Sequence, residues 1–255
     1  MHNTEQKTSS SFSNISIKNA VSNLWRWQWS IFGIPKKFWM RTLLLFPFAI
    51  LAYLAILIIA YSFINPALST FMADAALSGQ RISHKWVPLR RISKHVPVAV
   101  IMSEDNKFCK HYGVDLGELK AALLSNRDKP RGASTITMQT VKNLYLWSGR
   151  DYVRKAIEIP LAFTVSAVWS KRRTMEMYLN FAQFGPGIYG VEAAARYHFK
   201  KRASQLTRHE ASLLAAVLPN PTGRNAGRPG PKTRSVSRVI LRRMKAGRFY
   251  SSCVR

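Results

Sequence analysis

A long apolar stretch separates the N-terminal part of the chain from a region in which apolar positions recur with helical spacing. No charged side chain occurs between Thr42 and Ala73, and the segment from Leu43 to Ile64 is almost wholly apolar. As a helix, that segment would span roughly 33 Å, which is about the hydrocarbon thickness of a bilayer. A cleaved signal peptide has a shorter apolar region nearer the N-terminus. The pattern therefore predicts a transmembrane helix at residues 42–64.

The charges before this stretch predict its orientation. Lys36, Lys37 and Arg41 lie at the membrane edge, and Glu5 is the one acid that precedes the span. Because basic flanks stay on the cytoplasmic side, we expect residues 1–41 to be cytoplasmic and the rest of the chain to be periplasmic. Tryptophans that suit an interfacial belt also precede the span: Trp25, Trp27, Trp29 and Trp39.

The region after the span has helical periodicity and no convincing series of alternating strands. Beyond a linker at residues 65–87, we expect a mostly α-helical domain at 88–223, with a kink at Pro160. Its last helix should follow Thr207, and residues 224–255 read as a basic, loosely ordered C-terminal tail. Helix N-caps are expected at Asp115, Ser134 and Ser170, and another helix should open at Asp151.

Composition narrows the class of partner. The chain has 39 Lys and Arg against 12 Asp and Glu, a net charge of +27, while 47% hydrophobic residues exclude a disordered protein. So basic a chain needs an anionic partner, either nucleic acid, lipid headgroups or phosphorylated substrates. A domain outside the cytoplasm does not meet chromosomal nucleic acid, and no nucleic-acid-binding motif is present. Anionic lipids and lipid-linked phosphates are therefore favoured.

The two cysteines say little about function. Cys109 and Cys253 are far apart, and no further Cys or His stands at the spacing of a zinc site. One disulfide in an oxidising compartment stays open. Since Cys253 falls in the basic tail, two free thiols are the favoured prediction.

Two acids stand in apolar surroundings. Glu104 ends the uncharged run from Val96 to Ser103, and Glu158 lies between two isoleucines. Desolvation raises the pKa of a carboxyl group, which suits general acid or base catalysis near neutral pH. The alternative is a helix-end carboxylate paired with Lys or Arg, and spacing by itself favours that alternative.

Cations accompany these acids along the chain. A pyrophosphate can be held by such charges, although on so basic a chain any single one is more often a solvated surface residue. His111 receives no chemical role from its spacing. The cations on or beside the two segments that run from Gly132 to Glu158 are Arg131, Lys142, Arg150, Arg154 and Lys155.

Five segments, in order, resemble the five motifs of the family 51 peptidoglycan glycosyltransferases. The resemblance covers roughly residues 88–221. Two positions depart from the family pattern: Met138 stands where Gln is common, and Ile157 where Lys is frequent. The segments are Glu104–Gly113, Arg131–Gln139, Arg154–Glu158, Lys171–Asn180 and Thr207–Ala216.

The resemblance implies a mostly α, lysozyme-like domain of two lobes, with lipid II as substrate. Glu104 would be the general base that deprotonates the acceptor GlcNAc 4-hydroxyl for attack on C1 of the donor MurNAc. Inversion would release undecaprenyl pyrophosphate, so Glu158, the second catalytic carboxylate, would organise donor-site cations or a metal. The implied substrate-binding residues are Asp105, Ser134, Thr135, Gln139, Lys142, Arg150 and Arg154.

The resemblance also implies the surroundings of the enzyme. No metal ligands are assigned, and a divalent cation, Mg²⁺ or Mn²⁺, stays open as a cofactor. The expected partners are lipid II, the growing glycan strand, the bacterial cytoplasmic (inner) membrane and proteins of cell-wall synthesis or division. The chain lacks the Ser-x-x-Lys, Ser-x-Asn and Lys-Thr-Gly set of a penicillin-binding transpeptidase, as in monofunctional members of the family.

Two groups of residues, one in the fourth motif and one between the second and third, receive other interpretations. Tyr178, Leu179 and Asn180 are interpreted as the packed end of a helix. A second group is expected to dip into the bilayer where the lipid substrate enters: Leu144, Leu146 and Trp147.

Two alternatives to glycosyl transfer stay open. A lysozyme-like lytic enzyme also needs a carboxylate in a helical cleft, but the cations Lys142, Arg150 and Arg154 argue against it. A membrane-anchored binding or scaffold protein for anionic lipid or cell-wall polymer would use the basic charge alone. For such a protein, Glu104→Gln would leave function intact.

Overall fold

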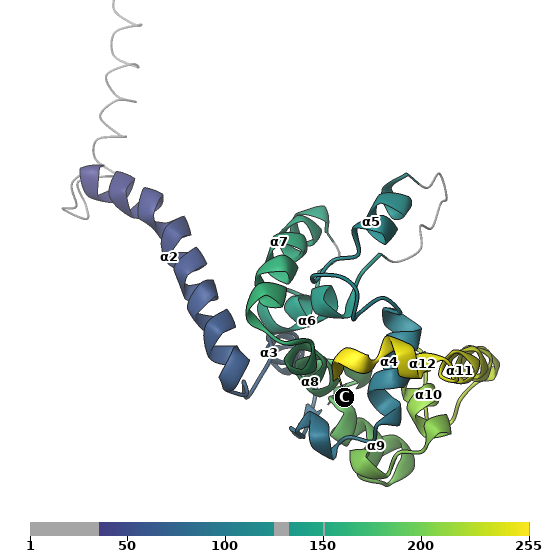
Figure 1. Ribbon diagram of the computed structural model, residues 1–255. Helices are drawn as coiled ribbons and strands as arrows, with labels where there is room; N and C mark the ends of the chain where they lie inside the picture. Colours follow the sequence, from purple (N-terminus) through teal and green to yellow (C-terminus); the bar gives the residue numbers. More distant parts are fainter. Residues whose placement is uncertain (1–35, 125–132, 150, 255) are drawn as a thin grey trace, which may run out of the picture. The chain divides into compact units, whose positions relative to one another are not determined.

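The computed structural model describes residues 36–124, 133–149 and 151–254 (Figure 1). The chain divides into two compact units, residues 1–57 and 58–255. Helix α2 (Lys36–Phe63) begins in the first unit and ends in the second. Within the described residues, its part Arg41–Phe63 is long and apolar enough to cross a membrane, in agreement with the predicted span at 42–64. Most of the predicted cytoplasmic flank lies outside the described residues.

The unit from residue 58 onward is mostly helical, as predicted. It also holds a small sheet of order β1-β3-β2, in which β1 is parallel and β2 antiparallel to β3. The helices are α3 (Thr70–Leu77), α4 (His95–Glu104), α5 (Leu116–Leu123), α6 (Ile136–Tyr145), α7 (Tyr152–Val168), α8 (Lys171–Phe181), α9 (Val191–Phe199), α10 (Arg208–Val217), α11 (Pro231–Arg243) and α12 (Gly247–Tyr250). The 3-10 helices and strands are η1 (Leu89–Arg91), η2 (Ala203–Gln205), η3 (Ser252–Val254), β1 (Ser83–His84), β2 (Gln183–Gly185) and β3 (Ile188–Tyr189).

Local capping sets most of the helix starts. Four predicted helix starts are confirmed, and at each one the side chain of the N-cap accepts a hydrogen bond from the backbone N–H three residues on: Asp115, Asp151, Ser170 and Thr207. The prediction at Ser134 is wrong by one residue. Thr135 is the N-cap of α6 and accepts from the Met138 N–H, so α6 begins one residue later than expected.

Two hydrophobic clusters form the interior of this unit. The larger includes buried residues of α4, α9, α10 and α11, and the smaller includes residues of α3, α6 and α7. Helices α6 and α8 contribute side chains to both, so they lie where the two clusters meet. This arrangement fits the predicted two lobes. The likeness to lysozyme stays a prediction.

The prediction of a loosely ordered C-terminal tail is wrong, and α10 is not the last helix. Helices α11 and α12 lie against α4, and α11 also packs on α10 (Figure 1). A stripe of small and apolar side chains on α11, including Ser237 and Ile240, is buried. The Ser237 hydroxyl is 2.6 Å from that of Ser212 on α10. Most Arg and Lys side chains of α11 are exposed. The basic composition of this segment therefore suggested disorder, although its buried stripe packs on the domain.

The prediction of two free thiols is also wrong. Cys109 and Cys253 form a disulfide, with Cα atoms 5.6 Å apart. The ordered C-terminal segment brings Cys253 to the loop that follows α4. That loop begins directly after Glu104, so the bond ties the end of the described chain to the neighbourhood of the first motif.

Candidate active site

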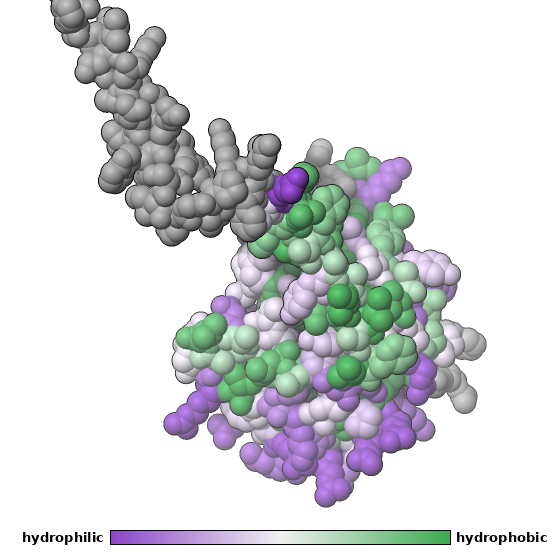
Figure 2. Space-filling model, turned by 90° about the vertical axis from the view of Figure 1, so that its left-hand side faces the viewer, coloured by the Kyte–Doolittle hydropathy of each residue, from purple (hydrophilic) through white to green (hydrophobic). Residues whose placement is uncertain are grey.

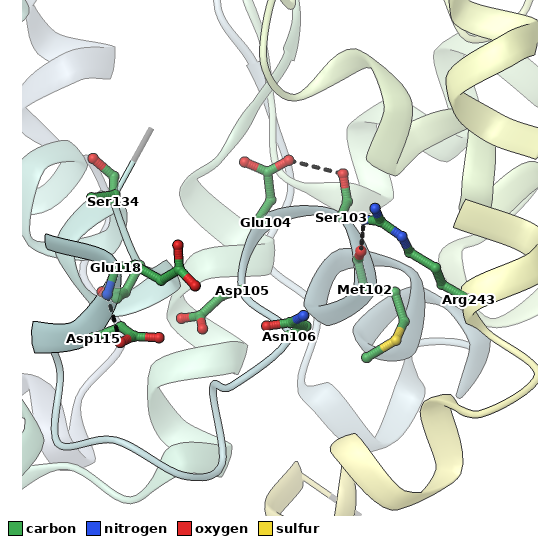
Figure 3. A pocket seen from close by; sticks show the side chains of 11 residues that line it. Met102, Ser103, Glu104, Asp105, Asn106, Asp115, Glu118, Ser134 and Arg243 are labelled. Carbon is green, nitrogen blue, oxygen red and sulfur yellow. Dashed lines mark hydrogen bonds between the residues drawn. The ribbon is translucent and has the colours of Figure 1, made fainter. Parts of the chain in front are cut away.

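A cavity of about 430 Å³ opens at the C-terminal end of α4 (Figure 3). Glu104 is the last residue of that helix, and Figure 3 shows its side chain between Ser103 on one side and Glu118 and Ser134 on the other. The residues that line the cavity are Met102, Ser103, Glu104, Asp105, Asn106, Asp115, Glu118, Ala133, Ser134, Thr135 and Arg243.

Hydrogen bonds orient the Glu104 carboxylate without neutralising it. The Ser103 hydroxyl donates to Oε1 at 2.9 Å, and Gln139 Nε2 donates to Oε2 at 3.2 Å. Tyr178, fully buried on α8, donates its hydroxyl to Gln139 Oε1 at 3.0 Å. Because the amide oxygen of Gln139 is occupied in this way, its NH₂ group faces the carboxylate. Among the described residues Glu104 has no ion pair, so the paired-carboxylate alternative does not apply to it there.

Burial raises the pKa of Glu104 above its ordinary value. The hydrogen bonds from Gln139 and Ser103 and the charge of Arg224 oppose this rise, while the charge of Asp105 adds to it. A carboxylate of raised pKa that opens into a cavity can accept a proton near neutral pH.

Asp105 lines the same cavity but is engaged within the protein. Its carboxylate accepts from the Ile136 N–H at 3.0 Å and lies 3.0 Å from His111 Nε2. Asp105 therefore joins the start of α6 to the loop after α4. Thr135 also has a structural task, because its hydroxyl donates to the Gly113 carbonyl and caps α6. Their predicted contacts with substrate stay predictions.

A buried ion-pair cluster lies beside the cavity. Lys155 Nζ donates to the Ser134 hydroxyl at 2.7 Å and to Glu158 Oε2 at 2.9 Å. Arg154 pairs with the other oxygen of Glu158, and the two residues are only 8% and 2% exposed. Arg154 Nε has no hydrogen-bond partner among the described residues. The paired-carboxylate alternative thus describes Glu158, which holds two cations within reach of Ser134.

Lys142, Arg131 and Arg150, the other cations of the predicted donor site, are not seen beside the cavity among the described residues. Lys142 follows Gln139 by about one turn of α6, and its ammonium group lies 5.4 Å from the ring centroid of Phe71 on α3. It is not part of the cavity lining. Arg131 and Arg150 lie outside the described residues.

No metal centre is recognisable in the described part of the chain. Four acids line the cavity, yet no group of three or more His, Cys, Asp or Glu side chains converges closely enough to hold an ion. The described side chains are thus not gathered as ligands for a divalent cation, and no chemical step is assigned to one.

Comparison with known proteins decides the family. A family model described as Transglycosylase matches residues 71–245. The chain belongs to the transglycosylase family. Three similar proteins are each named biosynthetic peptidoglycan transglycosylase. The protein of Rhizobium johnstonii is 48% identical over 215 residues, which are 80% of this chain and 87% of the relative. That of Agrobacterium fabrum is 47% identical over 207 residues (80% and 91%), and that of Brucella suis is 44% identical over 209 residues (81% and 93%).

Sequence reasoning missed part of this candidate site. Arg243, on α11, lines the cavity and donates to the Met102 carbonyl at 3.3 Å. Asp115 and Glu118 line the cavity as well, and both pair with Lys107 at 3.1 Å. The sequence offered one signal for Arg243. The small and apolar positions of α11 recur on one face, which indicates that this helix packs on the domain.

Proposed function

We propose that this transglycosylase polymerises lipid II into glycan strands in bacterial cell-wall synthesis, with Glu104 as the general base. The family match and the names of the relatives support peptidoglycan glycosyltransferase activity. One observation carries the assignment of the base: Glu104 is desolvated, hydrogen-bonded on both oxygens, and open to the cavity. A structural carboxylate on so basic a domain would be expected to have a cationic partner.

The proposed step needs one proton acceptor and a leaving group. The acceptor GlcNAc 4-hydroxyl gives its proton to Glu104 as its oxygen attacks C1 of the donor MurNAc. The C1–O bond breaks, and its electron pair leaves with undecaprenyl pyrophosphate, so the configuration at C1 inverts. Ser103 and Gln139 hold the carboxylate in one orientation during the transfer. Preorganisation of this kind lowers the barrier, because the groups do not rearrange as charge moves.

Charge on the departing pyrophosphate requires cations. Arg154 and Lys155 are held by Glu158, and Lys155 also contacts Ser134 at the cavity wall. We assign Glu158 the role of fixing these cations near the donor, and Lys142 and Arg150 remain proposed phosphate ligands.

We further propose that α2 anchors the enzyme in the cytoplasmic membrane, with the catalytic unit on the periplasmic side. The disulfide supports this side, because such bonds persist in oxidising compartments. Hydrophobic surface gathers on the face shown in Figure 2, above a hydrophilic lower edge. Exposed apolar side chains on α7 suit contact with the bilayer: Tyr152, Val153, Phe163 and Val168.

The predicted set of bilayer-contacting side chains needs a correction. Leu144 and Leu146 are buried in the smaller hydrophobic cluster, because the end of α6 packs beneath α3 and α7. Only Trp147 of that set is exposed, at 45%. On α7, Phe163 and Val168 are exposed and available for contact with the bilayer.

Glu104→Gln tests the proposed base and the scaffold alternative together. Detergent-solubilised full-length enzyme is incubated with labelled lipid II, with and without divalent cation, and the products are separated by length. Removal of a positioned base should lower the polymerisation rate about 10²–10⁴-fold. Glu210→Gln is a matched control, because Glu210 caps α10 at the N3 position, where Gln also serves.

Either of two results would contradict the proposal. Equal polymerisation by wild type and Glu104→Gln would remove Glu104 as the base. Binding of lipid II by wild type without any polymer would favour a scaffold protein.

A further inference from the structure

One guanidinium group fastens the end of the candidate membrane span to α8. Arg173 Nε donates to the Tyr61 carbonyl at 2.9 Å, and Nη2 donates to the Ile64 carbonyl at 2.7 Å. Nη1 donates to Asn65 Oδ1 at 2.9 Å, and the Trp86 ring lies 5.5 Å from the guanidinium carbon. Tryptophan is enriched at membrane–water interfaces, and arginine side chains near the end of a span reach the headgroup level. With α2 as the proposed anchor, this part of α8 would lie beside the membrane surface.

Two adjoining hollows begin at this place. The first, of about 350 Å³, is lined by Pro88, Leu89, Arg90, Arg172, Arg173 and Glu176. The second, of about 730 Å³, shares Leu89, Arg90 and Arg172 with the first and extends along the N-terminal end of α4. We call the two together the basic groove. The further charged or titratable residues of the second hollow are Lys94, His95 and Arg208.

Among the described residues, most of the positive charge of the basic groove has no acidic partner. Glu176 is the one acid in the lining, and it is occupied by Arg173 at 2.7 Å and by the Leu89 N–H at 2.7 Å. Burial, together with the charges of Lys94 and Arg208, lowers the pKa of His95, so the local field already disfavours a further cation. Arg90 is exposed and forms no ion pair within the described residues. The groove therefore attracts an anion.

The basic groove is separate from the cavity that holds Glu104. The two linings have no residue in common. Helix α4 carries His95 at its first position and Glu104 at its last, ten residues that span about 15 Å. A headgroup in the groove would therefore not be held by the residues that line the Glu104 cavity.

We propose that the basic groove binds the phosphate of an anionic phospholipid headgroup, with Arg90 and Arg172 as its main contacts. Guanidinium groups match phosphate oxygens in geometry and charge. A membrane lipid is the source at this place, because Arg173 holds the groove at the end of the span. The inference rests on the membrane anchoring proposed above and does not depend on Glu104 or on the identity of the glycosyl donor.

The test measures lipid binding directly. Full-length protein is purified in a non-ionic detergent, and native mass spectrometry counts bound dioctanoyl phosphatidylglycerol and dioctanoyl phosphatidylcholine. We expect phosphatidylglycerol to bind more tightly. Arg90→Gln should weaken it about fivefold and Arg90→Gln/Arg172→Gln about 30-fold, since each basic residue near an anionic surface contributes on this scale. Arg234→Gln/Arg238→Gln removes the same charge from exposed positions of α11 and should change the affinity less than twofold.

Several outcomes would overturn the inference. Equal binding of the two lipids, or equal losses in the groove and α11 variants, would show that only net charge matters. Displacement of phosphatidylglycerol by inorganic phosphate at equal concentration would make the groove a soluble-anion site. Tighter binding of an acidic peptide would assign it to a protein partner. Because Arg172 also donates to the Val254 carbonyl, Arg90→Gln alone keeps the test interpretable if the double variant unfolds.

Discussion

At the scale of residues, the two glutamates of the site differ in what surrounds their carboxylates. Glu104 has hydrogen-bond donors without positive charge, namely Ser103 and Gln139. Glu158 has two cations and almost no exposure. The Glu104 carboxylate can therefore accept a proton, whereas the charge of Glu158 is balanced by Arg154 and Lys155. Sequence reasoning placed both in apolar surroundings but could not tell them apart, because Gln139, which orients Glu104, comes from a helix distant in the sequence.

The acid limb of the pH profile should report on Glu104. Burial raises the pKa of Glu104, so kcat/KM should fall at a higher pH than an ordinary Glu would give. The Gln139 hydrogen bond lowers that pKa, so Gln139→Leu should move the limb to still higher pH. The measurement is the initial rate of lipid II consumption across pH for both enzymes. A limb that stays in place, or moves to lower pH, would contradict the assignment.

Lys171 should give the folded protein its own dependence on pH. Burial lowers the pKa of Lys171 to about 8, although the charge of Asp105 opposes the shift. Between pH 8 and the unfolded value of 10.5, the unfolded chain binds more protons, so this group makes stability rise with pH. Below pH 8 its desolvated charge opposes folding.

Lys171→Met should abolish that contribution. Urea unfolding of wild type and variant at pH 7 and pH 10 measures it, as the change with pH of the difference between their unfolding free energies. Parallel pH dependence in the two proteins would show that Lys171 titrates normally.

At the scale of elements, α7 brings a buried charge cluster to the site. Its first turns place Arg154 and Lys155 four and three residues before Glu158, so all three share one face of the helix. The N-cap Asp151 accepts from the Arg154 N–H at 2.6 Å and fixes where that face begins. These local relations follow from helical spacing. That the face is buried follows only from the packing of α6 on α7.

Glu158→Leu should destabilise the unit strongly, because it leaves the Arg154 guanidinium buried without a counter-charge. The expected loss is about 3–5 kcal/mol in the free energy of unfolding. Arg154→Leu/Glu158→Leu should recover part of it, because the second substitution removes the uncompensated charge. Urea denaturation of the single and double variants measures both effects. A double variant that is less stable than the single one would contradict a buried ion pair.

At the scale of the whole molecule, the C-terminal segment packs against the helices that carry the candidate site. Helix α11 packs on α10 and α4 and brings Arg243 to the cavity, and the disulfide joins Cys253 to the loop behind Glu104. Residues more than 130 positions apart thereby share one site. The transglycosylase match, which ends at residue 245, takes in the whole of α11.

Loss of the disulfide should lower stability by about 2–4 kcal/mol, because the bond closes a loop with a sequence separation of 144 residues. Cys109→Ser/Cys253→Ser should show this loss in urea without reductant. Dithiothreitol should destabilise wild type by a similar amount and leave the double variant unchanged. If reductant affects both proteins equally, the two thiols are not paired.

The sequence by itself determined the features whose causes are local. Hydropathy identifies the candidate membrane span, and capping side chains set the starts of α5, α7, α8 and α10, because these signals act within a few residues. The order of five motifs indicated the family that the comparisons show.

Only the tertiary structure decided which distant residues meet. Tyr178 orients Gln139 toward Glu104, and Cys109 pairs with Cys253, across separations that no local pattern encodes. The packing of α11, the burial of Leu144 and the place of Arg243 likewise depend on neighbouring elements. The physical reason is that burial and pairing depend on the summed packing of several helices, whereas propensity and capping depend on one.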